Sequence, residues 1–107
     1  MPEQLKKIPV VFFTTSVGNE PVREWLQELD KDDRREIGSD LRTLQYGWPV
    51  GMPLCRSLGE GLWEQRSKLP GRRIARLIFA FDHGTLVVLH GFIKKTQKTP
   101  PQDLALA

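Results

Sequence analysis

The sequence predicts an α+β fold in which two helices pack on an antiparallel β-sheet. Apolar residues recur at every third or fourth position between residues 22 and 44, which is typical of amphipathic helices. From residue 62 onward they alternate with polar residues, which is typical of strands with one buried face. Short turns separate these segments, as they do between antiparallel strands. The predicted order is β-α-α-β-β-β with a short C-terminal helix, and one face of the sheet is left available to a ligand.

The first half of the chain supplies one strand and two helices. Residues 10–14 are β-branched and aromatic, which predicts a strand buried on both faces. One helix is predicted to contain Pro21 in its first turn, and a second helix is predicted to be capped by Asp30. Glycines and prolines in residues 46–53 predict a loop after the second helix. The apolar residues that define the two helices are Val22, Trp25, Leu26, Leu29, Ile37, Leu41 and Leu44.

The second half supplies an antiparallel meander. Strands are predicted at 62–68, 74–81 and 85–93. Pro70-Gly71 and Asp82-His83-Gly84 predict the two turns between them. Thr99, with Pro100 after it, predicts the start of the C-terminal helix.

Length and composition bound the possible functions. We expect one domain over residues 1–107, because a chain of this length has room for a single core. No apolar run is long enough to span a membrane, and the N-terminal run is too short for a secretory signal, so we expect a cytoplasmic protein. Cys55 is the single cysteine, which excludes an internal disulfide and a cysteine-built zinc site; we interpret it as structural.

Charge is distributed unevenly along the chain. Residues 1–50 contain seven basic and nine acidic side chains, whereas residues 51–107 contain nine basic and four acidic ones. A basic C-terminal half is compatible with a surface that binds a polyanion and equally with an uneven solvated surface. The acidic residues of the helices (Glu28, Asp32, Asp33 and Glu36) are interpreted as a solvated face, with contact to a basic partner as the alternative.

Strand alternation gathers cations on one face of the meander. Glu64, Arg66 and Lys68 share a face of the first meander strand. Arg76 lies in an otherwise apolar strand, so it either pairs with a carboxylate such as Glu64 or contacts a ligand. The last strand ends in a run of lysines, which is suited to phosphate but is also found where a strand end is kept soluble.

Well-known catalytic motifs are missing. The sequence has no phosphate-binding loop, no dinucleotide glycine fingerprint and no His-Glu-x-x-His helix. His83 and His90 are too few for a histidine-based ribonuclease pair, and His90 is interpreted as a core residue between apolar neighbours.

Three segments are distinctive: Leu62-Trp63-Glu64-Gln65-Arg66, the strand around Arg76, and the string from Leu89 to Pro100 (LHGFIKKTQKTP). Together they resemble the HigB-type toxins, the phage Gp-like branch of the RelE/ParE toxin–antitoxin superfamily. The last string is the most specific, and the resemblance runs over nearly the whole chain. It implies a RelE/ParE-like fold, with the element order predicted above.

The resemblance implies a toxin that cleaves mRNA on the ribosome and is neutralised by a HigA-type antitoxin with a helix-turn-helix. In such relatives the RNA 2′-hydroxyl attacks the adjacent phosphate without a metal, and no cofactor is expected. Operator DNA would be contacted only through the antitoxin. The reaction needs a proton acceptor, cations for the phosphorane and a proton donor for the leaving 5′ oxygen.

The residues that match this chemistry are basic. The expected catalytic residues are Arg66, Arg76, Lys94, Lys95 and Lys98, and the expected RNA-binding residues are Lys68, Arg72, Arg73 and Gln97. Glu64 is an alternative base, although an orienting role beside the arginines is favoured. Relatives sometimes use an aromatic or hydroxyl residue near the chain end, where this sequence offers only Thr99. The alternatives are a gyrase-inhibiting toxin of the same fold and a non-catalytic RNA-binding module.

Overall fold

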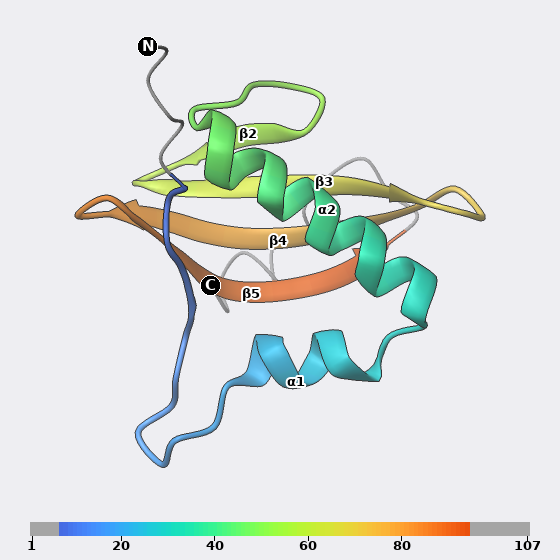
Figure 1. The fold of residues 1–107 in the computed structure, drawn as a ribbon, viewed down its shortest axis with the longest axis horizontal. Helices are drawn as coiled ribbons and strands as arrows, with labels where there is room; N and C mark the ends of the chain where they lie inside the picture. The colour runs from blue at the N-terminus through green and yellow to red at the C-terminus, as the bar shows by residue number, and fades with distance from the viewer. Residues whose placement is uncertain (1–6, 95–107) are drawn as a thin grey trace, which may run out of the picture.

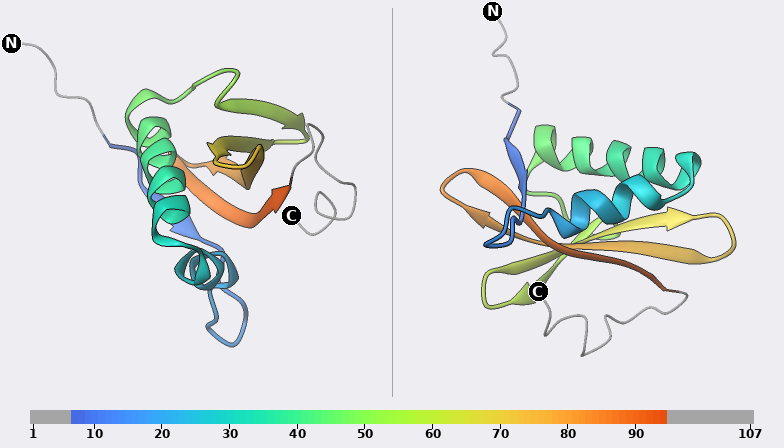
Figure 2. Two further views of the ribbon diagram at one scale, coloured as in Figure 1. Left: turned by 90° about the vertical axis from the view of Figure 1, so that its right-hand side faces the viewer. Right: turned by 90° about the horizontal axis from the view of Figure 1, so that it is seen from below.

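The computed structural model describes residues 7–94 as a five-stranded sheet with two helices on one face (Figures 1 and 2). The elements are β1 (Val10–Phe12), α1 (Pro21–Glu28), α2 (Lys31–Gly47), β2 (Cys55–Gly59), β3 (Leu62–Leu69), β4 (Arg73–Asp82) and β5 (Thr85–Lys94). The α+β class and the placement of both helices on one face are confirmed. Within residues 7–94, no helix has the length and apolar character needed to cross a bilayer.

The strand order is β1-β5-β4-β3-β2. The chain therefore starts at one edge of the sheet, passes over one face as α1 and α2, and returns strand by strand from the opposite edge (Figure 1). The meander of β3, β4 and β5 was predicted within one or two residues at each end. The prediction of a purely antiparallel sheet was wrong, because β1 pairs with β5 in parallel.

Strand β2 was not predicted, and the observed order is β-α-α-β-β-β-β. Its sequence, Cys-Arg-Ser-Leu-Gly, has no apolar alternation, and antiparallel pairing with β3 holds it at the sheet edge. The turn between the two strands uses three consecutive residues with positive φ, namely Gly59, Glu60 and Gly61. At its other end, β2 is preceded by Pro53 and Leu54. The backbone N–H of Arg66 donates to the Leu54 carbonyl at 2.7 Å, and β2 begins at the following residue.

Three further details of the predicted elements were wrong. Strand β1 is not buried on both faces, because it is an edge strand with a single neighbour, and Val11 is 46% exposed. Asp30 occupies the N-cap position of α2 but makes no side-chain capping hydrogen bond. Helix α2 runs on through Gly47, so the loop begins later than predicted. The helix predicted after Thr99 lies outside the described residues.

The core lies between the helices and the sheet. Helix α1 packs on β5 and α2 packs on β3. The fully buried apolar side chains include Ile37, Leu44, Leu77, Phe79, Leu86 and Val88. Gly91 allows the close approach of α1, because a Cβ at this position would lie 2.6 Å from Cζ3 of Trp25. The glycine of the His-Gly-Phe string therefore has a packing role on the helix-covered face.

Candidate functional site

The sheet face opposite the helices, here called the open face, carries an ordered array of polar residues. Strand register aligns them in three rows that run across the sheet. The first row is Arg56, Glu64, Ile78 and His90; the second is Arg66, Arg76 and Phe92; the third is Lys68, Ile74 and Lys94. Because neighbouring strands lie about 4.8 Å apart, long side chains of adjacent rows reach one another.

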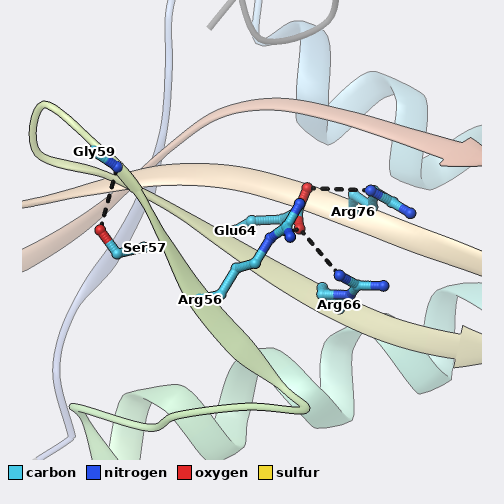
Figure 3. A network of polar contacts seen from close by, with 6 residues as sticks. All are labelled: Arg56, Ser57, Gly59, Glu64, Arg66 and Arg76. Carbon is cyan, nitrogen blue, oxygen red and sulfur yellow. Dashed lines mark hydrogen bonds and ion pairs between the residues drawn. The ribbon is translucent and has the colours of Figure 1, made fainter. Parts of the chain in front are cut away.

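Three arginines from three strands converge on one carboxylate. Arg56 Nε donates to Glu64 Oε1 at 3.0 Å. Arg66 Nη1 lies 3.9 Å from the same oxygen, and Arg76 Nη1 lies 3.6 Å from Glu64 Oε2. Figure 3 shows these guanidinium groups approaching Glu64 from β2, β3 and β4. We call these four residues the arginine cluster.

Three of the four side chains of the arginine cluster are largely removed from water, whereas that of Arg56 is 32% exposed. The side chains of Glu64 and Arg76 are both 0% exposed, and that of Arg66 is 9% exposed. Burial lowers the pKa of Arg76 from its usual value, and the Glu64 charge opposes this shift. The neighbouring positive charges of Arg66 and Arg56 lower the pKa of Arg76 further. Such crowding of like charges is unfavourable unless anionic groups balance it.

One buried carboxylate, that of Glu64, lies near all three guanidinium groups. The four side chains of the arginine cluster carry a formal charge of +2, since one Glu stands against three Arg. Guanidinium groups offer planar pairs of N–H donors that match phosphate oxygens. The cluster is therefore chemically suited to an oxyanion on the open face.

The basic end of the array extends the positive surface. Lys68 and Lys94 are exposed at the two ends of the third row. Arg72 is exposed in the turn between β3 and β4, where its φ is 60°. Lys68 and Lys94 lie in the row next to Arg66 and Arg76, and Arg72 lies in the turn beyond that row, so the three could contact the backbone of a polyanion.

Arg73 does not belong to this surface. It lies on the helix-covered side, where Nη1 and Nη2 donate to the two carboxylate oxygens of Asp33 at 2.9 and 3.1 Å. The hydrogen bond to Asp33 raises the pKa of Arg73. This bidentate pair connects the first turn of α2 to the start of β4.

The described residues thus bring together five of the nine expected site residues. Arg66, Arg76, Lys68, Arg72 and Lys94 lie on or beside the open face, and Arg73 is separate. Lys95, Gln97 and Lys98 lie outside residues 7–94. The sequence left two possibilities for Arg76, a pair with a carboxylate such as Glu64 or contact with a ligand. The structure shows the pair with Glu64.

Sequence reasoning missed Arg56. The signal for it was the Gly59-Glu60-Gly61 turn, because a hairpin at that turn places Arg56 opposite Glu64. His90 also differs from expectation. It is half-buried on the open face, with its ring centroid 5.6 Å from that of Phe92.

Cys55 is buried at the start of β2 and is 1% exposed. Burial and the nearby Glu64 charge raise the pKa of its thiol to about 11. A protonated, inaccessible thiol is a poor nucleophile, which agrees with a structural role.

Comparison with known proteins identifies the family. Curated proteins and solved structures give no match to the chain. Residues 24–107 match the family model described as Phage derived protein Gp49-like (DUF891), and this range includes the second part of α1, all of α2, β2 to β5 and the arginine cluster. This family lies in the superfamily of RelE-like toxins. The chain belongs to the phage-derived Gp49-like family of toxin-like proteins.

Proposed function

We propose that this chain is the HigB-type toxin of a toxin–antitoxin system and cleaves mRNA on the ribosome without a metal ion. Membership of a toxin-like family supports the toxin role, and with it an antitoxin partner. The convergence of three arginines on one buried carboxylate supports the chemistry most directly. We further propose that a HigA-type antitoxin neutralises the chain.

The reaction assigned to the site is an internal transesterification of RNA. The 2′ oxygen attacks the neighbouring phosphorus, the bond from phosphorus to the 5′ oxygen breaks, and the 2′ proton is lost. The leaving 5′ oxygen takes up a proton. The products are a 2′,3′-cyclic phosphate and a 5′-hydroxyl, so atoms and charge balance without an added reactant.

The cations of the open face stabilise the dianionic phosphorane. Arg66 holds the non-bridging oxygens, because its side chain is the more exposed of the two central arginines. Arg76 lies directly opposite Arg66 in the strand register and adds buried positive charge behind it. Glu64 orients the guanidinium groups and is a positioning residue.

Proton transfer is assigned to the lysines, since Glu64 already accepts from Arg56 and lies near two further guanidinium groups. Lys94 is the described member of this set and stands in the row next to Arg76. Lys95 and Lys98 are the other members. Lys68 and Arg72 bind the flanking phosphates.

The direct test is cleavage of mRNA by the purified chain on translating ribosomes, with mapping of the RNA ends. We expect new ends with 5′-hydroxyl and 2′,3′-cyclic phosphate groups, and their loss in the Arg66→Ala variant. Arg42→Ala removes an exposed arginine of α2 and serves as the matched control.

Other outcomes contradict the proposal. Intact mRNA together with arrested DNA supercoiling would assign the chain to the gyrase-inhibiting toxins. Retention of RNA without new ends would reduce it to an RNA-binding module.

A further inference from the structure

A groove of mixed charge lies at the free end of β3. Because β2 begins at Cys55, the last residues of β3 have β4 on one side and, within residues 7–94, no strand on the other. The groove has a volume of about 240 Å³. Its lining residues are Glu36 and Asp40 from α2, Pro53 and Leu54 from the loop, and Arg66 and Lys68 from β3.

A second hollow continues the groove toward the open face. It has a volume of about 260 Å³ and shares Pro53, Arg66 and Lys68 with the first, adding Met52 and Ile74. Arg66 thus belongs both to the groove and to the arginine cluster. A ligand bound at the cluster can therefore extend into the groove without leaving the protein surface.

The walls of the groove differ in chemistry. Arg66 and Lys68 offer donors and positive charge on one side, whereas Glu36 and Asp40 offer acceptors and negative charge on the other. Pro53 and Leu54 add apolar lining. A matching ligand has an anionic group, a flat apolar body and hydrogen-bond donors. A nucleotide whose base carries donors has these three parts.

We infer that this groove binds one base of the RNA and selects guanine over uracil. The inference rests on the proposed function, since it places the phosphate of that nucleotide near Arg66. Guanine presents N1–H and the N2 amino group side by side, and a carboxylate can accept both. Uracil presents one N–H between two carbonyl acceptors, which the carboxylates repel. Glu36 and Asp40 are thus specificity-determining residues of the site.

A peptide segment of mixed charge is the competing occupant, for example from an antitoxin. The nucleotide is favoured because the groove shares Arg66 with a cluster suited to phosphate.

The test measures the binding of GMP and of UMP to the purified chain. Shifts of the backbone amide NMR signals of Leu54 and Lys68 report the binding. Inorganic phosphate alone measures the contribution of the anion. We expect GMP to bind at least about five-fold more tightly than UMP, in line with base-edge hydrogen bonding. The double variant Glu36→Gln with Asp40→Asn should lose this preference while it still binds phosphate. Asp32→Asn, an exposed carboxylate of the same helix, is the matched control and should keep it.

The outcomes separate the two proposals. Equal affinity for GMP and UMP overturns the base site even if mRNA is cleaved. Selective GMP binding without mRNA cleavage supports the base site in the groove and contradicts the proposed nuclease activity. If the NMR signals of Leu54 and Lys68 shift with an antitoxin and not with nucleotides, the groove binds a peptide segment and the inference is overturned.

Discussion

Two ion-pair arrangements lie on opposite faces of the same sheet, and they differ in stoichiometry. On the helix-covered side, Asp33 pairs with Arg73 one to one in a bidentate geometry. On the open face, Glu64 is shared by three arginines. The one-to-one pair joins α2 to β4 and has a structural role. The arginine cluster gathers several guanidinium groups, whose planar pairs of N–H donors also suit the oxygens of an anionic ligand.

Removing the shared carboxylate has the largest expected effect. Glu64→Gln leaves three crowded guanidinium groups without their common partner, and we expect the free energy of unfolding to fall by about 3–5 kcal/mol. This is a large part of the stability of a small domain. Urea denaturation measures it, and Glu60→Gln in the exposed turn is the matched control. A loss no larger than the control's would show that Glu64 does not hold the cluster together.

Removing one arginine of the arginine cluster should affect activity more than folding. Arg66→Ala is expected to slow mRNA cleavage about 100-fold or more, as does loss of one group that stabilises an oxyanion. Its effect on the unfolding midpoint should be much smaller than that of Glu64→Gln. Arg66→Lys keeps the charge without the planar fork and should be intermediate in rate. Full cleavage by the alanine variant at equal folded concentration would remove Arg66 from the catalytic residues.

The one-to-one pair should show the opposite pattern. Asp33→Asn removes the charged partner of Arg73 and lowers the unfolding midpoint, by less than Glu64→Gln does, because Arg73 is partly exposed. Cleavage per folded molecule should be unchanged, since this pair lies away from the open face. A rate defect without a stability defect would mean that the two faces are coupled.

The smallest expected effect concerns Cys55, whose thiol is buried and lies near the charge of Glu64. Its pKa is raised from 9.0 to about 11, so below about pH 9 the thiol is protonated in both folded and unfolded chains. As the pH rises from about 9 to 11, the unfolded thiol ionises first, and the folded state loses stability. We expect Cys55→Ser to remove about 1–2 kcal/mol of this alkaline loss, measured by urea denaturation at several pH values. An identical pH dependence in both proteins would contradict the raised pKa.

The spacing of apolar residues predicted the elements that bury a hydrophobic face of their own. The strands β3 to β5 and both helices carry such patterns, and each was found within a few residues. Strands β1 and β2 are short edge strands. Pairing with a neighbouring strand fixes their positions, and their own sequences show little alternation of apolar and polar residues. The parallel pairing of β1 depends on long-range contacts that no local pattern contains.

The same distinction applies to the site. Alternation correctly predicted that Glu64 and Arg66 share a face, and the pairing of Arg76 with Glu64 was one of the two readings left open. Arg73 was grouped with them by composition, although it stands three residues from Arg76 and an odd spacing on a strand means opposite faces. Arg56 was missed because β2 itself was missed. The groove joins α2 to β3 across the sheet edge, and no sequence spacing encodes that neighbourhood.

The proline next to the outermost strand has a further consequence. The Leu54 carbonyl faces β3, so the backbone nitrogen of the preceding residue, Pro53, faces away from the sheet. Most other residues at this position would present an N–H to a neighbouring molecule along the outer edge of the sheet. Proline has no N–H to present, and this makes edge-to-edge association less favourable.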